Sequence, residues 1–256
     1  MHDLSGILAI WYREYKVFLR EKSRIVASIV TPVLWLFIFG GGLGGSVTIP
    51  GTNYQAFIYP GILAQSVLFS SIFFGVYIVW DRKVDFLKEV LVAPVSRTGI
   101  FLGKVVGGAT DSLIQAAILL ALGVILIRTG VITGLRLGAA QVALGALVLA
   151  VTTVAFVSVG LIIGSVMESP EGFQLVSSFV VFPLFFLSGA LFSIDRLPGW
   201  LAPFTFLDPL TYAVDALRAV MVGTSHFHFA FDLGVVAAFT VAIIGVGTWA
   251  FERMKV

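Results

Sequence analysis

The sequence predicts an all-α integral membrane protein that folds as a single transmembrane domain over residues 1–256, with six transmembrane helices. Hydrophobic residues make up 59% of the chain, charged residues make up 12%, and the mean hydropathy is +1.04, unlike a soluble domain. A helix needs about 20 apolar residues to cross the hydrocarbon core of a bilayer. Six stretches satisfy this length, at residues 25–43, 57–79, 105–127, 139–166, 173–194 and 233–251.

The composition also argues against several classes of function. The six stretches leave no segment large enough for a soluble catalytic domain, so we expect any nucleotide hydrolysis to occur on another chain. The chain has no cysteine and three histidines, so we expect no metal site and no cofactor in this chain. Lys and Arg gather beside the apolar stretches, as topology signals do, so nucleic acid is not an expected partner.

The distribution of basic residues predicts the orientation of the chain. The segment before the first stretch, the loop after the second and the C-terminal tail together hold 12 of the 16 Lys and Arg residues, and the opposite side holds 4. Basic residues accumulate on the cytoplasmic side of membrane proteins. We therefore expect a multi-pass protein of the cell membrane with both termini in the cytoplasm.

Residues 1–24 precede the first predicted span and carry a helical pattern. Leu4, Leu8, Trp11 and Tyr15 recur at three and four residues, while charged residues occupy much of the remaining face. This pattern predicts an amphipathic helix that lies in the cytoplasmic interface of the membrane. It serves either as a simple lipid anchor or as an elbow that also touches a partner subunit.

The loop at residues 81–104 combines charges with a second helical stripe. Val84, Leu87 and Leu91 are spaced by three and four residues, which predicts one amphipathic helix from Asp81 to Ala93. Pro94 ends this helix because proline disfavours the helical conformation of the residue before it. The alternative is a solvated connector between two spans.

Residues 195–222 form an apolar segment that is too broken to cross the bilayer. Pro198, Gly199, Pro203 and Pro209 interrupt it. We expect external, re-entrant helical pieces, because backbone groups exposed to lipid must be paired. Within this segment, Asp215 and Arg218 are three residues apart and are expected to pair on one helical face.

Three sequence features occur in a moderately specific order: the amphipathic N-terminus, the stretch Leu91-Val92-Ala93-Pro94-Val95-Ser96-Arg97 with Leu102-Gly103-Lys104 behind it, and the region 184–218. The last region contains Leu187-Ser188-Gly189-Ala190, then Leu197-Pro198, then Pro209-Leu210-Thr211-Tyr212 with Arg218 six residues on. With these features the chain resembles the membrane subunits of type-2 ABC exporters, the permeases of daunorubicin, nodulation-factor, teichoic-acid and O-antigen export.

The resemblance implies that two permeases pair, as a homodimer or a heterodimer, and that each docks a separate nucleotide-binding ATPase subunit. ATP and Mg²⁺ are then expected on that partner rather than on this chain. The resemblance makes the 81–93 helix the coupling helix, whose apolar stripe would bury against the ATPase. The candidate docking residues are Arg82, Val84, Leu87, Lys88, Leu91, Pro94 and Arg97.

Polar and aromatic side chains inside the spans are the remaining candidates. Gln65 and Ser66 face either a substrate path or a neighbouring helix. Asp111 and Gln115 share one face of the third span, where Asp111 either pairs with a cytoplasmic cation or takes part in gating. The resemblance places the second and fifth spans along the central pathway, so an apolar translocation surface is expected from Phe69, Phe73, Phe182 and Phe186.

The expected function is export of a hydrophobic or amphipathic molecule, drug-like or lipid, from the cytoplasm or inner leaflet. A close alternative is export of a lipid-linked polysaccharide or glycolipid. A membrane scaffold or an intramembrane hydrolase is the alternative from a different class, but the latter needs a base beside a nucleophile, and no histidine lies in any predicted span.

Overall fold

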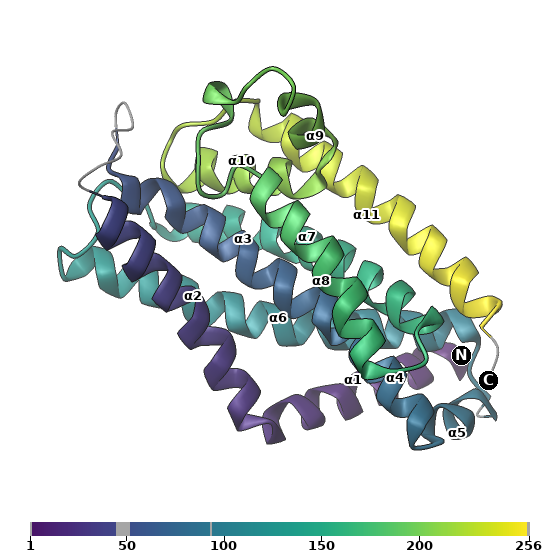
Figure 1. Cartoon of the computed structure of the whole chain (residues 1–256). Helices are drawn as coiled ribbons and strands as arrows, with labels where there is room; N and C mark the ends of the chain where they lie inside the picture. Colours follow the sequence, from purple (N-terminus) through teal and green to yellow (C-terminus); the bar gives the residue numbers. More distant parts are fainter. Residues whose placement is uncertain (1, 45–51, 93, 255–256) are drawn as a thin grey trace.

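The computed structural model describes residues 2–44, 52–92 and 94–254. Over these residues the fold is helical, with elements arranged in a bundle (Figure 1). The elements in chain order are α1 (His2–Arg20), α2 (Lys22–Leu43), α3 (Tyr54–Phe74), α4 (Val76–Lys83), α5 (Phe86–Val92), α6 (Arg97–Arg128), α7 (Ala139–Val166), α8 (Pro170–Leu187), a 3₁₀ turn (Ile194–Arg196), α9 (Ala202–Leu207), α10 (Pro209–Met221) and α11 (Phe229–Glu252).

The prediction of six transmembrane helices is confirmed. Among the described residues, six helical segments are long and apolar enough to cross a membrane: Ile25–Gly42, Tyr54–Lys83, Arg97–Arg128, Ala139–Val166, Pro170–Leu187 and Phe229–Glu252. The fifth ends at Leu187 rather than at residue 194, because the chain turns at Gly189, which has a φ of 70°. Glycine adopts this left-handed conformation without the steric penalty of a side chain.

The two ends of the bundle are distinct in Figure 1. Both chain termini lie at one end, beside α1 and α5, and we call this the terminal end. The short helices α9 and α10 lie at the opposite end, which we call the far end. The segment 195–222 contains the helices α9 and α10, which are separated at Asp208, and its re-entrant position outside the spans stays a prediction.

The core of the bundle forms around α3. This helix contacts α2, α6, α7, α8 and α10. In the span Tyr54–Lys83, which α3 and α4 form, 72% of the apolar stretch is buried within the chain. The corresponding shares are 17% for α2, 22% for α8 and 17% for α11. These three helices therefore leave most of their apolar surface for lipid or for another protein chain.

Glycines allow α7 to pack directly against the junction of α3 and α4. A Cβ atom on Gly75 would overlap the carbonyl oxygen of Gly160, and one on Gly164 would overlap the carbonyl oxygen of Gly75. Gly160 and Gly164 are one helical turn apart, the spacing at which small residues let two membrane helices approach at backbone distance. The backbones of the two helices are therefore in direct contact here, with no side chain between them.

The single amphipathic helix predicted over residues 81–93 is wrong. The helix ends at Lys83, and α5 begins at Phe86 after Asp85, which has a φ of 56°. The break separates the residues of the predicted stripe: Val84 is 66% exposed, whereas Leu87 is fully buried. Leu87 joins a small core with Phe74, Ile78 and Phe101, so burial inside this chain, rather than a partner surface, explains its apolar character.

Candidate functional site

A pocket of about 440 Å³ opens between α2, α3, α6 and α8. Clefts of this size suit drug-sized ligands. We call it the membrane pocket, because every helix that forms it is one of the six spans. It is lined by Ala27, Ser28, Thr31, Pro32, Trp35, Gln65, Ser66, Phe69, Ser70, Phe73, Gln115 and Phe182.

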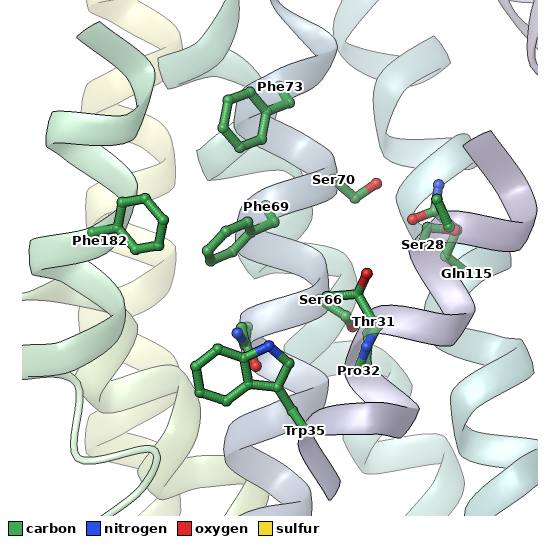
Figure 2. A pocket seen from close by; sticks show the side chains of 12 residues that line it. Ser28, Thr31, Pro32, Trp35, Ser66, Phe69, Ser70, Phe73, Gln115 and Phe182 are labelled. Carbon is green, nitrogen blue, oxygen red and sulfur yellow. The ribbon is translucent and has the colours of Figure 1, made fainter. Parts of the chain in front are cut away.

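Aromatic rings form one side of the membrane pocket. The ring centroids of Phe69 on α3 and Phe182 on α8 are 5.7 Å apart in an edge-to-face arrangement, and Phe73 lies 6.1 Å from Phe69. Trp35 on α2 meets the ring of Phe185 edge-on at 5.6 Å. Figure 2 shows Phe69 and Phe73 on the side of α3 that faces Phe182. Edge-to-face contacts of this kind hold rings in fixed positions.

Polar side chains form the other side. In Figure 2, Ser28, Ser70 and Gln115 lie toward α2, away from the ring of Phe182. Gln115 is 1% exposed and Gln65 is 5% exposed. Within the described part of the chain, the amide oxygen of Gln65 and both amide atoms of Gln115 have no hydrogen-bond partner. A buried polar group without a partner costs about 1–3 kcal/mol, which marks these amides as features that packing does not explain.

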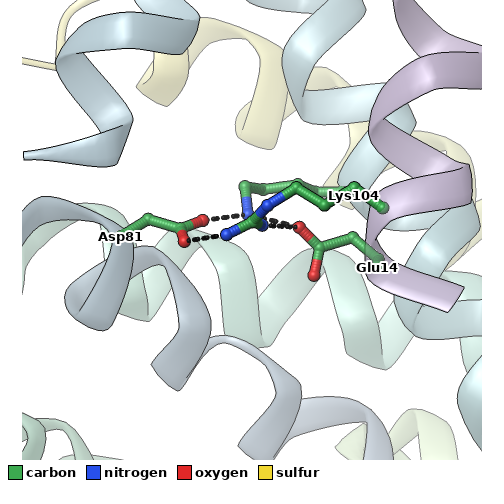
Figure 3. Close-up of polar contacts among 4 residues, drawn as sticks. Glu14, Asp81 and Lys104 are labelled. Atoms are coloured by element: carbon green, nitrogen blue, oxygen red, sulfur yellow. Dashed lines mark hydrogen bonds and ion pairs between the residues drawn. The ribbon is translucent and has the colours of Figure 1, made fainter. Parts of the chain in front are cut away.

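A buried cluster of four charges joins three helices at the terminal end. The Nζ atom of Lys104 on α6 lies 2.6 Å from Oδ2 of Asp81 on α4 and 3.0 Å from Oε1 of Glu14 on α1 (Figure 3). Arg13 completes what we call the Lys104 cluster, at 2.8 Å from Asp81 and 2.7 Å from Glu14. The side chains of Lys104, Asp81 and Glu14 are 2%, 6% and 1% exposed. Each buried charge is thus compensated by opposite charges.

Glycine and aromatic neighbours complete this cluster. A Cβ atom on Gly107 would crowd the side chain of Glu14, so the glycine admits α1 against α6. Arg13 also stacks over the ring of Phe86, with its guanidinium carbon 3.9 Å from the ring centroid. Such a cation–π contact adds an attraction between α1 and α5.

Comparison with known proteins identifies the family. The family model described as "ABC-2 type transporter" matches residues 5–222, which run from α1 to the end of α10. The chain belongs to the ABC-2 type transporter family. It is 28% identical over 251 residues to nodulation protein J of Rhizobium meliloti (strain 1021), covering 96% of this chain and 92% of that protein. It is also 28% identical over 245 residues to the inner membrane transport permease YadH of Escherichia coli (strain K12), covering 93% and 91%.

Membership of the ABC-2 type transporter family, together with the six spans, identifies the chain as a multi-pass membrane permease and implies a partner ATPase subunit. The membrane pocket and the terminal end are therefore the two parts of the fold that bear on transport. The pocket offers an apolar binding surface inside the bilayer. The terminal end carries α1, α4 and α5, where the sequence places the docking residues.

Several predicted docking residues serve the internal structure of this permease. Arg82 donates to the carbonyl oxygens of Ser165 and Met167 at the end of α7. Arg97 donates to the carbonyl oxygens of Glu252 and Met254 at the end of α11. These bonds tie the terminal end together.

Other predicted docking residues remain on the surface. Val84 and Pro94 are exposed, as is Val92, at 86%. The side chains of Lys88 and Leu91 lie outside the described residues. An ATPase at the α4–α5 turn would thus meet Val84, Val92 and Pro94 rather than a stripe that includes Leu87.

The predicted pathway residues converge. Gln65, Ser66, Phe69, Phe73 and Phe182 all line the membrane pocket, together with Gln115. Phe186 lies outside the lining but stacks on Phe182 at 6.4 Å. The sequence interpretation missed the α2 wall at Ser28, Thr31, Pro32 and Trp35. The signal was a proline among hydroxyl residues in the middle of a span.

The expected pairing of Asp215 with Arg218 is wrong. Asp215 accepts hydrogen bonds from the backbone N–H groups of His226 and Phe227, at 2.8–2.9 Å. Arg218 donates to the carbonyl oxygen of Gly189 at 3.0 Å and lies 3.8 Å over the ring of Phe57. Burial lowers the pKa of Arg218 to about 10, against the opposing effect of Asp215 and Asp195. The side chains of Asp215 and Arg218 thus connect α10 to neighbouring segments at the far end.

Lys104 on α6 is the cation whose partners the structure describes, and the expected pairing of Asp111 with a cytoplasmic cation stays a prediction. Lys104 pairs with Glu14 and Asp81, two carboxylates on other helices. Asp111 lies seven positions further along α6 and is 1% exposed. Pairing of Lys104 across helices rather than along α6 explains why the spacing within one span does not reveal its partners.

Proposed function

We propose that this chain is the membrane-spanning permease subunit of an ATP-driven exporter that moves an uncharged hydrophobic or amphipathic molecule out of the cytoplasm or inner leaflet. The observation that carries the proposal is the membrane pocket. Aromatic rings line it on one side and amides and hydroxyls on the other, and none of its twelve described lining residues is ionisable. An ion would lose its hydration there without gaining a counter-charge.

The ATPase is placed on a separate subunit that binds ATP and Mg²⁺. The terminal end is the docking side in this proposal, and the excess of Lys and Arg around it supports a cytoplasmic location. The exposed apolar side chains of Val84, just before α5, and Val92, at its end, offer a contact surface. The Lys104 cluster would pass force from this surface into α6, because it links α1, α4 and α6.

A second permease copy is part of the proposal. α2 and α8 border the membrane pocket and expose large apolar side chains, among them Leu34 and Phe37 on α2 and Phe179 and Phe186 on α8. A copy packed over these two helices would separate the pocket from the surrounding lipid. We propose a homodimer of this kind, with membrane lipids covering the remaining apolar surface.

Export of a lipid-linked polysaccharide or glycolipid is the second candidate. The polar side of the pocket, which includes Ser28, Ser70 and Gln115, favours a ligand that carries a polar head group. A scaffold or hydrolase role has less support. A hydrolase needs a base beside its nucleophile, and the described lining of the pocket contains hydroxyl groups but no histidine, lysine or carboxylate that could act as the base.

A transport assay tests the proposal. The permease and its ATPase are reconstituted in liposomes, and ATP hydrolysis is measured with drugs, lipids and glycolipids of matched chain length. We expect stimulation by uncharged amphipathic compounds and its loss in Phe69→Ala and Phe182→Ala. Trp200→Ala is the control, because that side chain is 71% exposed and lies outside the pocket. Equal stimulation in all three variants would remove the pocket from the pathway, and stimulation by glycolipids alone would select the second candidate.

A further inference from the structure

The buried amides of the membrane pocket have unpaired donor and acceptor atoms that a bound ligand could satisfy. Both amide atoms of Gln115 and the amide oxygen of Gln65 lack partners among the described residues. Both side chains line the pocket. A carboxamide side chain presents a donor and an acceptor side by side, so a bound group that also donates and accepts would satisfy both.

The three serine hydroxyl groups of the pocket are already engaged. Ser28 donates to the carbonyl oxygen of Ile25 at 2.8 Å, and Ser66 donates to that of Leu63 at 2.7 Å. Ser70 shares a 2.8 Å hydrogen bond with Ser112. Among the buried polar atoms of the pocket lining, the amide oxygen of Gln65 and both amide atoms of Gln115 are the ones without a partner.

Pro32 adds a backbone acceptor to the same wall. Proline has no N–H, so the carbonyl oxygen of Ser28, one turn earlier in α2, receives no helical hydrogen bond from residue 32. Ser28 and Pro32 both line the pocket. The amide group of Gln115 and the residue Ser28, whose carbonyl oxygen lacks its helical donor, thus lie on the side of the pocket away from the ring of Phe182.

We propose that the membrane pocket recognises a neutral carboxamide group of an amphipathic molecule, with Gln115 as the specificity-determining residue. A carboxamide can exchange two hydrogen bonds with the Gln115 side chain, whereas an ester can only accept one. The apolar part of the molecule lies against Phe69, Phe73 and Phe182. This inference rests on the proposed function, because it names the ligand chemistry of the same pocket.

Photolabelling with two matched probes tests the inference. The probes are dodecanamide and methyl dodecanoate with the same diazirine in the chain, added to the full-length protein in lipid nanodiscs. Labelling of peptides from α2, α3 and α8 is measured by mass spectrometry. It is normalised to labelling around Val241 on α11, which is 72% exposed and reports the probe concentration in the bilayer.

In the wild type we expect the amide probe to label the pocket about tenfold more than the ester, the effect of one additional hydrogen bond in a buried site. In Gln115→Leu both probes should still label the pocket, and they should label it about equally, because leucine forms a hydrogen bond with neither head group. Thr153→Val is the control, because its hydroxyl bonds within α7, and it should keep the preference.

Equal labelling of the wild type by both probes would overturn the amide inference and leave the proposed function intact. A preference that survives in Gln115→Leu would also overturn it, as would loss of labelling by both probes in that variant. If neither probe labels the pocket of the wild type, the proposed function fails together with the inference.

Discussion

The ammonium group of Lys104 lies 2.6 Å from the carboxylate of Asp81, and this ion pair joins α6 to α4 across a boundary from which water is excluded. Glu14 of α1 approaches the same ammonium group at 3.0 Å. Three helices that are far apart in the sequence therefore depend on one buried cation.

Removal of one partner from the Lys104 cluster should destabilise the fold strongly. Lys104→Met leaves Glu14 and Asp81 buried close to each other with only Arg13 for compensation, and breaking a buried pair typically costs about 3–5 kcal/mol. The measurement is thermal unfolding in detergent. Glu14→Gln combined with Asp81→Asn and Lys104→Met should recover much of the loss, since the one charge that remains in the cluster, Arg13, is 35% exposed and can be hydrated. If Lys104→Met unfolds at the wild-type temperature, the cluster does not hold the terminal end together.

The glycines between α3 and α7 should not tolerate a methyl group. In Gly160→Ala the new Cβ would overlap the backbone of Ile72, so the helices must separate, and overpacking of this kind costs about 1–3 kcal/mol. Gly234→Ala in α11 is the matched control, because no atom lies within 4 Å of its new Cβ. The control should be neutral or more stable by up to about 1 kcal/mol, through helix propensity. Comparison of the two unfolding midpoints checks the prediction.

Asp208 should make stability depend on pH. Burial raises the pKa of its carboxyl group from the ordinary 3.8 to about 8, although the N–H of Leu210 donates to it. The folded state thus binds a proton that the unfolded state releases, so stability should fall as the pH rises from about 4 to about 8. Asp208→Asn keeps the helix cap and should remove this slope, and Asp208→Ala should also remove it but be about 1 kcal/mol less stable than Asp208→Asn at every pH. An unchanged slope in Asp208→Asn would assign the pH dependence to another group.

Leu87 and Val84 should respond differently to a charge. Leu87→Asp places a carboxylate in the core formed with Phe74 and Phe101, so the permease itself should unfold at a lower temperature. Val84 is 66% exposed, so Val84→Asp should leave unfolding unchanged and weaken copurification with the ATPase. Val131→Asp at the far end is the control for an added surface charge, since Val131 is 47% exposed. Full ATPase retention by Val84→Asp would remove the α4–α5 turn from the docking surface.

The number of spans was predictable from the sequence because bilayer thickness imposes a length on every apolar helix. The contact partners were not, because they depend on residues distant in the chain. Gln65 and Gln115 stood out as polar residues within spans, but their meeting at one pocket with Pro32 and Trp35 of α2 required the packing of four helices.

The errors have physical causes. The stripe of Val84 and Leu87 indicated a single helix, but the backbone turns at Asp85 with a φ of 56°, a conformation that hydrophobic periodicity does not encode. Lys104 was counted among residues that report topology. Its burial follows from Glu14 and Asp81, which lie 90 and 23 positions away in the sequence.

The glycine contact of α7 with the α3–α4 junction also bears on movement. Helices in backbone contact at Gly75, Gly160 and Gly164 cannot slide past each other without a backbone clash, so α3 and α7 move together as one rigid unit. α2 and α8 contribute side chains such as Trp35 and Phe182 to the pocket, and these side chains can change rotamer. Opening and closing of the pocket would therefore move α2 or α8 relative to α3, while Phe69 and Phe73 on α3 keep their positions.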